Sequence, residues 1–107
     1  MNKIELMGRL VADVEVKKGK TGTEYTNFTI AVPRKGNKEV TDFINCVAFG
    51  KICEALVKYT EKGNRIIVIG SLNLDKFTDK DGNFHTSVSI LVDDFYFVDF
   101  KAKKEEN

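Results

Sequence analysis

The stretch Thr41 to Lys51, TDFINCVAFGK, decides the fold class, because its residues alternate with the period of a β-strand. One face of this strand carries Phe43, Asn45, Val47 and Phe49. The other face carries small or medium apolar residues suited to a packed interior: Ile44, Cys46 and Ala48. Two phenylalanine rings beside a polar residue predict a stacking platform on the sheet surface. The competing interpretation is that this face is also buried, under a loop or a neighbouring subunit.

Alternation elsewhere in the chain predicts four more strands, at Ile4–Val16, Tyr25–Val32, Ile66–Phe77 and Phe84–Val92. The first strand is expected to bend near Asp13. Gly8, in mid-strand, predicts a bulge or sharp coiling where one strand serves both halves of a barrel. Lys17 to Gly22 is expected to be a turn, and Pro33 to end the ladder of the second strand.

The period changes to that of a helix after Gly50. Ile52, Ala55, Leu56 and Tyr59 recur at i, i+3, i+4 and i+7, and Gly63 is placed for a C-terminal stop. Five strands with one short helix between the third and fourth predict an all-β fold. We expect a five-stranded Greek-key barrel of the OB-fold type over residues 1–100, with a disordered end at residues 101–107.

Composition excludes several classes of protein. Lys and Arg number 17 against 16 Asp and Glu, so any basic surface requires charges to be sorted between faces. The longest apolar run, Ile66 to Ile69, is far shorter than the roughly 20 residues that span a bilayer, so no membrane role is expected. Cys46 and Cys53 fall inside predicted elements and the start MNKIELMGRL does not resemble a signal peptide, which favours a reducing cytoplasm.

Metal and catalytic chemistry are not expected. Cys46, Cys53 and His85 lack the spacing of a zinc site. The DKDG sequence at Asp79–Gly82 would place Phe77 and Val88 at positions where a calcium loop needs carboxylates, so it predicts a hairpin turn. No nucleophile motif or phosphate-binding loop is present, so we expect neither a cofactor nor an enzyme.

Several motifs in order then resemble one known family. NKIELMGRL, NFTIAV, DFINCVAFGK, EKG after the helix, IGSL and FTDKDGN look like bacterial and phage single-stranded DNA-binding protein, over residues 2 to about 98. The family binds single strands on an OB-fold by stacking bases on aromatic rings and holding phosphates with basic side chains, a mechanism already established for it.

The resemblance implies a stacking set of Phe43, Phe49 and Phe77. It also implies phosphate contacts by basic residues, for which the candidates are Arg9, Lys17, Lys18, Arg34, Lys35, Lys51, Arg65 and Lys76. Two departures from the family pattern predict a weaker or shorter DNA path. Arg34, Lys35 and Gly36 stand where a fourth aromatic residue is usual, and Asn73 and Asp75 stand where basic residues are common.

The implied function is sequence-independent coating and protection of single-stranded DNA in replication, recombination and repair, within a bacterial or phage-infected cell. The implied assembly is a homo-oligomer, with a tetramer favoured over a dimer and the first strand as the candidate interface. One alternative is a primosome-type accessory protein that acts mainly through protein contacts. Another is an adaptor barrel in which a partner covers the three phenylalanines.

The C-terminal sequence KAKKEEN differs from the acidic tip, ending in Pro-Phe, with which family members recruit replication and repair enzymes. We therefore expect no such recruitment through Lys101–Asn107. Removing these residues is expected to leave DNA affinity nearly unchanged, because their charges are mixed.

Overall fold

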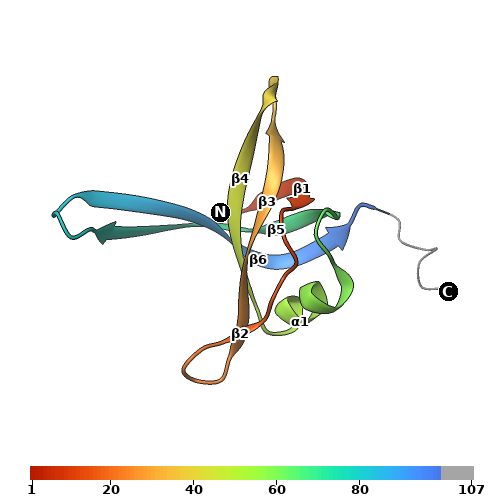
Figure 1. Cartoon of the computed structure of the whole chain (residues 1–107), viewed down its shortest axis with the longest axis horizontal. Coiled ribbons are helices and arrows are strands. Elements are labelled where there is room, and N and C mark those ends of the chain that lie inside the picture. The colour runs from red at the N-terminus through yellow and green to blue at the C-terminus, as the bar shows by residue number, and fades with distance from the viewer. Residues whose placement is uncertain (100–107) are drawn as a thin grey trace.

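The computed structural model describes residues 1–99. In chain order the elements are β1 (Ile4–Leu10), β2 (Lys17–Lys18), β3 (Glu24–Arg34), β4 (Asn37–Phe49), α1 (Gly50–Tyr59), β5 (Arg65–Thr78) and β6 (Phe84–Phe97). Two long hairpins, β3–β4 and β5–β6, project from the centre of the molecule in different directions (Figure 1). Phe100 and the end Lys101–Asn107, which was expected to be disordered, lie outside the described residues.

The five long strands close into a barrel. β1 pairs with β5 from Ile4 to Arg9 and also with β3 at Arg9 and Leu10. β3 pairs with β4 and β5 with β6, each antiparallel. The ring is sealed by a short parallel contact of β4 with β6, Cys46 opposite Ile90 and Val47 opposite Leu91. The predicted five-stranded barrel with a helix between its third and fourth long strands is confirmed, and β2 is a two-residue addition to its edge.

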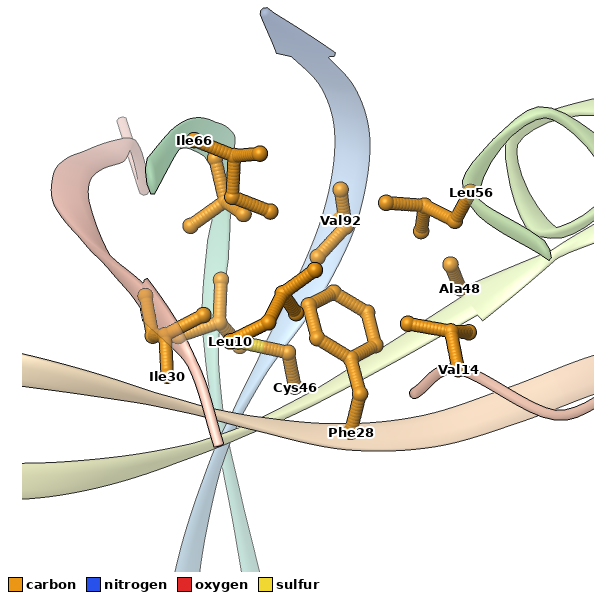
Figure 2. Close-up of a cluster of buried hydrophobic side chains, with 11 residues drawn as sticks. Leu10, Val14, Phe28, Ile30, Cys46, Ala48, Leu56, Ile66 and Val92 are labelled. Carbon is orange, nitrogen blue, oxygen red and sulfur yellow. The ribbon is translucent and has the colours of Figure 1, made fainter. Parts of the chain in front are cut away.

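The barrel interior is filled by the inward-facing residues of every long strand together with one residue of the helix (Figure 2). Fully buried side chains include Leu10, Ile30, Cys46, Ile66 and Ile90. Each large aliphatic side chain removed from water contributes roughly 1.5–3 kcal/mol, so this core is the main stabilising term. Cys46 and Ala48 are buried while Phe43 and Phe49 are exposed, as the alternation in β4 predicts.

Helix α1 packs against β3, β4 and β6. Its side chains Leu56 and Cys53 are fully buried, whereas Tyr59 is 50% exposed and does not belong to the buried stripe. The helix ends at Tyr59, and the Thr60 hydroxyl and N–H both donate to the Leu56 carbonyl. Gly63 is therefore not the helix stop. Its N–H instead donates to the Leu10 carbonyl at 2.8 Å, which ties the following turn to β1.

Several predicted strand limits are wrong. The first strand ends at Leu10, not Val16. Its last residues, Arg9 and Leu10, pair with β3, and beyond them the side chain of Val14 is buried in the core. Lys17 and Lys18 form β2 and are not part of the turn. Pro33 still pairs with Thr41, and the β3–β4 register shifts directly after it, between Pro33 and Arg34, so regular pairing ends one residue later than predicted. The last strand continues to Phe97.

Two glycines mark close approaches between strands. At Gly8 the pairing with β5 is unbroken, so the bulge, one of the two predicted alternatives, is wrong, while β1 does pair with both β5 and β3 as predicted. An added Cβ would lie 2.6 Å from the Ala31 carbonyl oxygen of β3. Gly70 lies at a register shift after Ile69, and a Cβ there would overlap the Leu91 carbonyl oxygen. Both glycines allow the barrel strands to come together.

The only helix in residues 1–99, α1, is too short to cross a bilayer.

Gly70→Ala is expected to lower the free energy of unfolding by roughly 1–3 kcal/mol or more, because the new methyl group has to displace backbone atoms. The measurement is urea denaturation. Gly19→Ala is the matched control, because its added Cβ would lie 3.7 Å from the Thr23 carbonyl oxygen, an ordinary contact. Equal stabilities of the Gly70 variant and the parent would contradict the close approach of β5 and β6 at Gly70.

Candidate nucleic-acid interface

The outer face of the β3–β4 hairpin carries two exposed rings. Phe43 is 66% exposed and Phe49 is 48% exposed, and both alternate with the buried residues of β4. Between them on the same face is Asn45, whose Oδ1 accepts a hydrogen bond from the Thr29 hydroxyl of β3 at 3.2 Å. The side chain that the sequence places between the rings is thus held in position by the neighbouring strand.

Tyr25 of β3 extends this aromatic face, although the sequence analysis did not include it in the stacking set. It pairs in register with Phe49, and the two ring centroids lie 6.1 Å apart at an interplanar angle of 38°. The alternation of β3 places Tyr25 on the outer face with Asn27 and Thr29. Its contact with Phe49 depends on the strand register, which the sequence pattern alone does not give.

The third predicted ring belongs to a different part of the molecule, the projecting end of the β5–β6 hairpin (residues 72–90), here called the arm. Phe77 is 52% exposed and stacks on His85 with a centroid distance of 5.1 Å and an interplanar angle of 20°. His85 Nε2 lies 2.7 Å from Asp79 Oδ2. His85 therefore positions the ring, a role that the sequence analysis missed.

A groove of about 480 Å³ lies between the outer face of β3–β4 and the arm. One wall comes from the outer face of β3–β4, including Asn45 and Val47, and the other from the arm, including Asn73 and Asp75. Asn45 lies between Phe43 and Phe49 on one wall, and Asp75 precedes Phe77 by two residues on the same face of the arm. The three predicted stacking residues do not line the groove themselves, but each shares a strand face with residues that do.

Two of the predicted basic residues align with Phe43. Arg65 pairs with Arg9, Arg9 with Ala31, and Ala31 with Phe43, which forms one row across four strands. Both arginines approach Asp99, with Arg65 Nε at 2.9 Å and an Arg9 guanidinium nitrogen at 4.0 Å. The hydrogen bond from the Arg65 backbone N–H, with those from its side chain, holds the pKa of Asp99 below its ordinary value.

Three predicted lysines lie at the opposite end of this surface. Lys17 pairs with Tyr25 and so shares its face, whereas Lys18 pairs with Glu24 and points to the other face. Lys51 lies in the first turn of α1, two residues after Phe49. All three side chains are exposed. Lys17 and Lys51 are thus close to the Tyr25–Phe49 pair, and Lys18 is not on its face.

The remaining basic candidates are less favourably placed. Arg34 binds Asp42 with two hydrogen bonds, of 2.6 and 3.1 Å, which hold the pKa of Asp42 below its ordinary value. Lys35 is exposed at the tip of the β3–β4 hairpin. Lys76 alternates with Phe77 along β5 and therefore lies on the other face of the arm. The side chains of Lys76 and Phe77, although adjacent in sequence, therefore do not lie on the same surface.

Neither cysteine is placed for catalysis or metal binding. Burial raises the pKa of the Cys46 thiol to about 12, so this group stays protonated and is a poor ligand or nucleophile. Cys53, a residue of α1, is fully buried. Within residues 1–99 no three side chains of the His, Cys, Asp and Glu type gather as a metal site.

The hydrogen bonds of the Asp79 carboxylate are expected to make the stability of the arm depend on pH. This carboxylate accepts hydrogen bonds from His85 and from the N–H groups of Asn83 and Asp81, which lower its pKa. Because the unfolded value is about 3.9, this stabilisation is present above roughly pH 4 and is lost as the pH falls through the folded-state value.

A carbon-13 NMR titration of the Asp79 carboxyl group measures this effect. The midpoint is expected below the unfolded value in the parent protein and closer to it in His85→Ala. Asp42 is the internal control, because its low pKa depends on Arg34 and should not respond to His85. An unchanged Asp79 midpoint in the variant would show that His85 does not hold the carboxylate.

Comparison with known proteins agrees with the barrel fold. The model of the single-strand binding protein family matches residues 1–98. The single-stranded DNA-binding protein of Clostridium perfringens is 37% identical over 92% of this chain and 67% of its own length. That of Fusobacterium nucleatum is 37% identical over 95% of this chain and 70% of its own.

A solved structure, the Plasmodium falciparum SSB complex with ssDNA, has the same fold. It aligns with a TM-score of 0.78 and 26% identity, covering 92% of this chain and 96% of the other. Sequence and fold therefore agree over nearly the same residues. The chain belongs to the single-strand binding protein family.

Proposed function

We propose that this protein binds single-stranded DNA and protects it during replication, recombination and repair. The observation that carries the proposal is the exposure of Phe43, Phe49 and Phe77 on the strand faces that also line a groove between β3–β4 and the arm. Stacking on aromatic rings tolerates any sequence, because every base has a flat π-face. The names of the relatives and the DNA in the Plasmodium complex support the same ligand class.

In this proposal the rings bind the bases and the flanking basic residues bind the phosphates. Arg9 and Arg65 are in line with Phe43, and Lys17 is in line with Tyr25 and Phe49. Phosphate contacts weaken as salt is added, whereas stacking depends less on salt. We infer a DNA path that is shorter than in relatives with more basic residues, because Asn73 and Asp75 line the groove.

The protein acts by binding and not by catalysis, in the cytoplasm of a bacterium or of a phage-infected cell. No cofactor is required, because stacking and ion pairing use only side chains of this chain. Recruitment of enzymes through the C-terminal residues 101–107 is not part of the proposal.

We also propose that the protein forms a homo-oligomer, with a tetramer favoured over a dimer. Met7, Ile67 and Tyr96 are paired in one row across β1, β5 and β6, on the outside of the barrel. Met7 and Tyr96 are 48% and 53% exposed. A second subunit that covers this row removes apolar surface from water and leaves the rings on β4 accessible.

Phe43→Ala and Phe49→Ala are each expected to weaken binding to poly(dT) about tenfold or more, since stacking contributes about 1–3 kcal/mol per base. Neither change should alter the slope of log affinity against log salt. Lys17→Ala is expected to cost less and to flatten that slope by about 0.7, the value for one phosphate contact on a single strand. Fluorescence anisotropy titrations at several salt concentrations give both quantities.

Tyr59→Ala is the matched control, because Tyr59 is a similarly exposed ring on the helix. It should bind poly(dT) like the parent. If folded Phe43 and Phe49 variants also bind like the parent, these rings are not the DNA platform and a partner or subunit covers them instead.

Light scattering is expected to give the mass of a tetramer for the parent at micromolar concentration, and a smaller species for Ile67→Lys. A lysine in the middle of the apolar row would place a positive charge in the interface without an oppositely charged partner. Val57→Lys, an exposed change on the helix, should leave the mass unchanged. A monomeric parent would remove the oligomer from the proposal.

A further inference from the structure

The groove between the β3–β4 hairpin and the arm is unsuited to phosphate. Its lining includes the amides of Asn27, Asn45 and Asn73 and the hydroxyls of Ser87 and Ser89. Among residues 1–99, Asp75 is the only charged residue that lines it, and no Lys or Arg does so. A phosphate inside the groove would meet the negative charge of Asp75 without a basic partner. The groove therefore favours neutral groups that can donate hydrogen bonds.

Internal hydrogen bonds fix which groups remain available on each wall. The Thr29 hydroxyl donates to Asn45 Oδ1 at 3.2 Å, so the Asn45 amide nitrogen keeps its two N–H groups for a ligand. On the arm, Asn73 Nδ2 donates to Asp75 Oδ2 at 3.2 Å. A carboxylate has about four acceptor sites, so Asp75 can still accept two hydrogen bonds, one on each oxygen.

The rings bring base edges to these groups. Asn45 lies between Phe43 and Phe49 on β4, and Asp75 shares its face of the arm with Phe77. A base that stacks near the groove thus presents its edge to a wall that holds a carboxylate. In single strands the Watson–Crick edge is free for such contacts.

Guanine is the base that matches a carboxylate best. Its Watson–Crick edge places two donors side by side, N1–H and the 2-amino group, whereas adenine, cytosine and thymine each present one donor group there. Hydrogen bonds to an ionised acceptor are about twice as strong as those between neutral groups, and a bidentate pair adds specificity. We propose that the groove binds guanine through Asp75, a preference that adds to the sequence-tolerant binding and rests on the proposed function.

The test compares two thymidine oligonucleotides that differ only at isolated positions, which carry guanine in one and hypoxanthine in the other. Hypoxanthine keeps N1–H but lacks the 2-amino group. The parent protein is expected to bind the guanine oligonucleotide about fivefold more tightly, toward the low end of the discrimination known for a bidentate base contact. Asp75→Asn is expected to reduce this ratio to about one.

Asp81→Asn is the matched control, because it removes the same charge from the tip of the arm, outside the residues that line the groove. Both variants lose repulsion toward phosphates, but only Asp75→Asn should lose the preference for guanine. A parent that binds both oligonucleotides equally, or an Asp75→Asn variant that keeps the preference, overturns the inference and leaves the proposed function intact. A parent that binds neither oligonucleotide overturns both.

Discussion

The short parallel contact between β4 and β6 is the constraint on which the rest of the structure depends. Cys46 pairs with Ile90 and Val47 with Leu91, and this seam turns a sheet of long strands into a closed barrel. Cys46 and Ile90 are each 1% exposed, so the seam is also the centre of the core. Because side chains alternate along a strand, burying Cys46 and Ala48 leaves Phe43 and Phe49 facing outward.

Closure also sets where the arm begins. The arm follows the register shift at Gly70, and β5 and β6 remain paired along it. Residues of the arm face residues of the outer face of β3–β4 across the groove. The two hairpins leave one small barrel in different directions, as Figure 1 shows. Aromatic rings flank this groove, the arginines lie in the row of Phe43, and Asp75 lies within it. Stacking, ion pairing and base-edge contacts are thus given different places on one surface.

The sequence predicts the barrel and the exposure of Phe43 and Phe49, because a period of two assigns each residue to a face without knowledge of its neighbours. It does not predict cross-strand contacts, since these depend on register. The Tyr25–Phe49 contact, and the loss of Arg34 to an ion pair with Asp42, both follow from how β3 meets β4. The sequence does not choose between a bulge and sharp coiling at Gly8 for a related reason, because both favour glycine.

Photocrosslinking tests most directly the claim that closure of the barrel creates one DNA surface. The protein is bound to a single-stranded oligonucleotide that contains 5-iododeoxyuridine, and the complex is irradiated. The crosslinked protein is then digested with a protease, and the linked residues are identified by mass spectrometry. The account predicts crosslinks at Phe43, Phe49 and Phe77. Crosslinks confined to the helix at Tyr59, or to the outer row of Met7 and Tyr96, would contradict it.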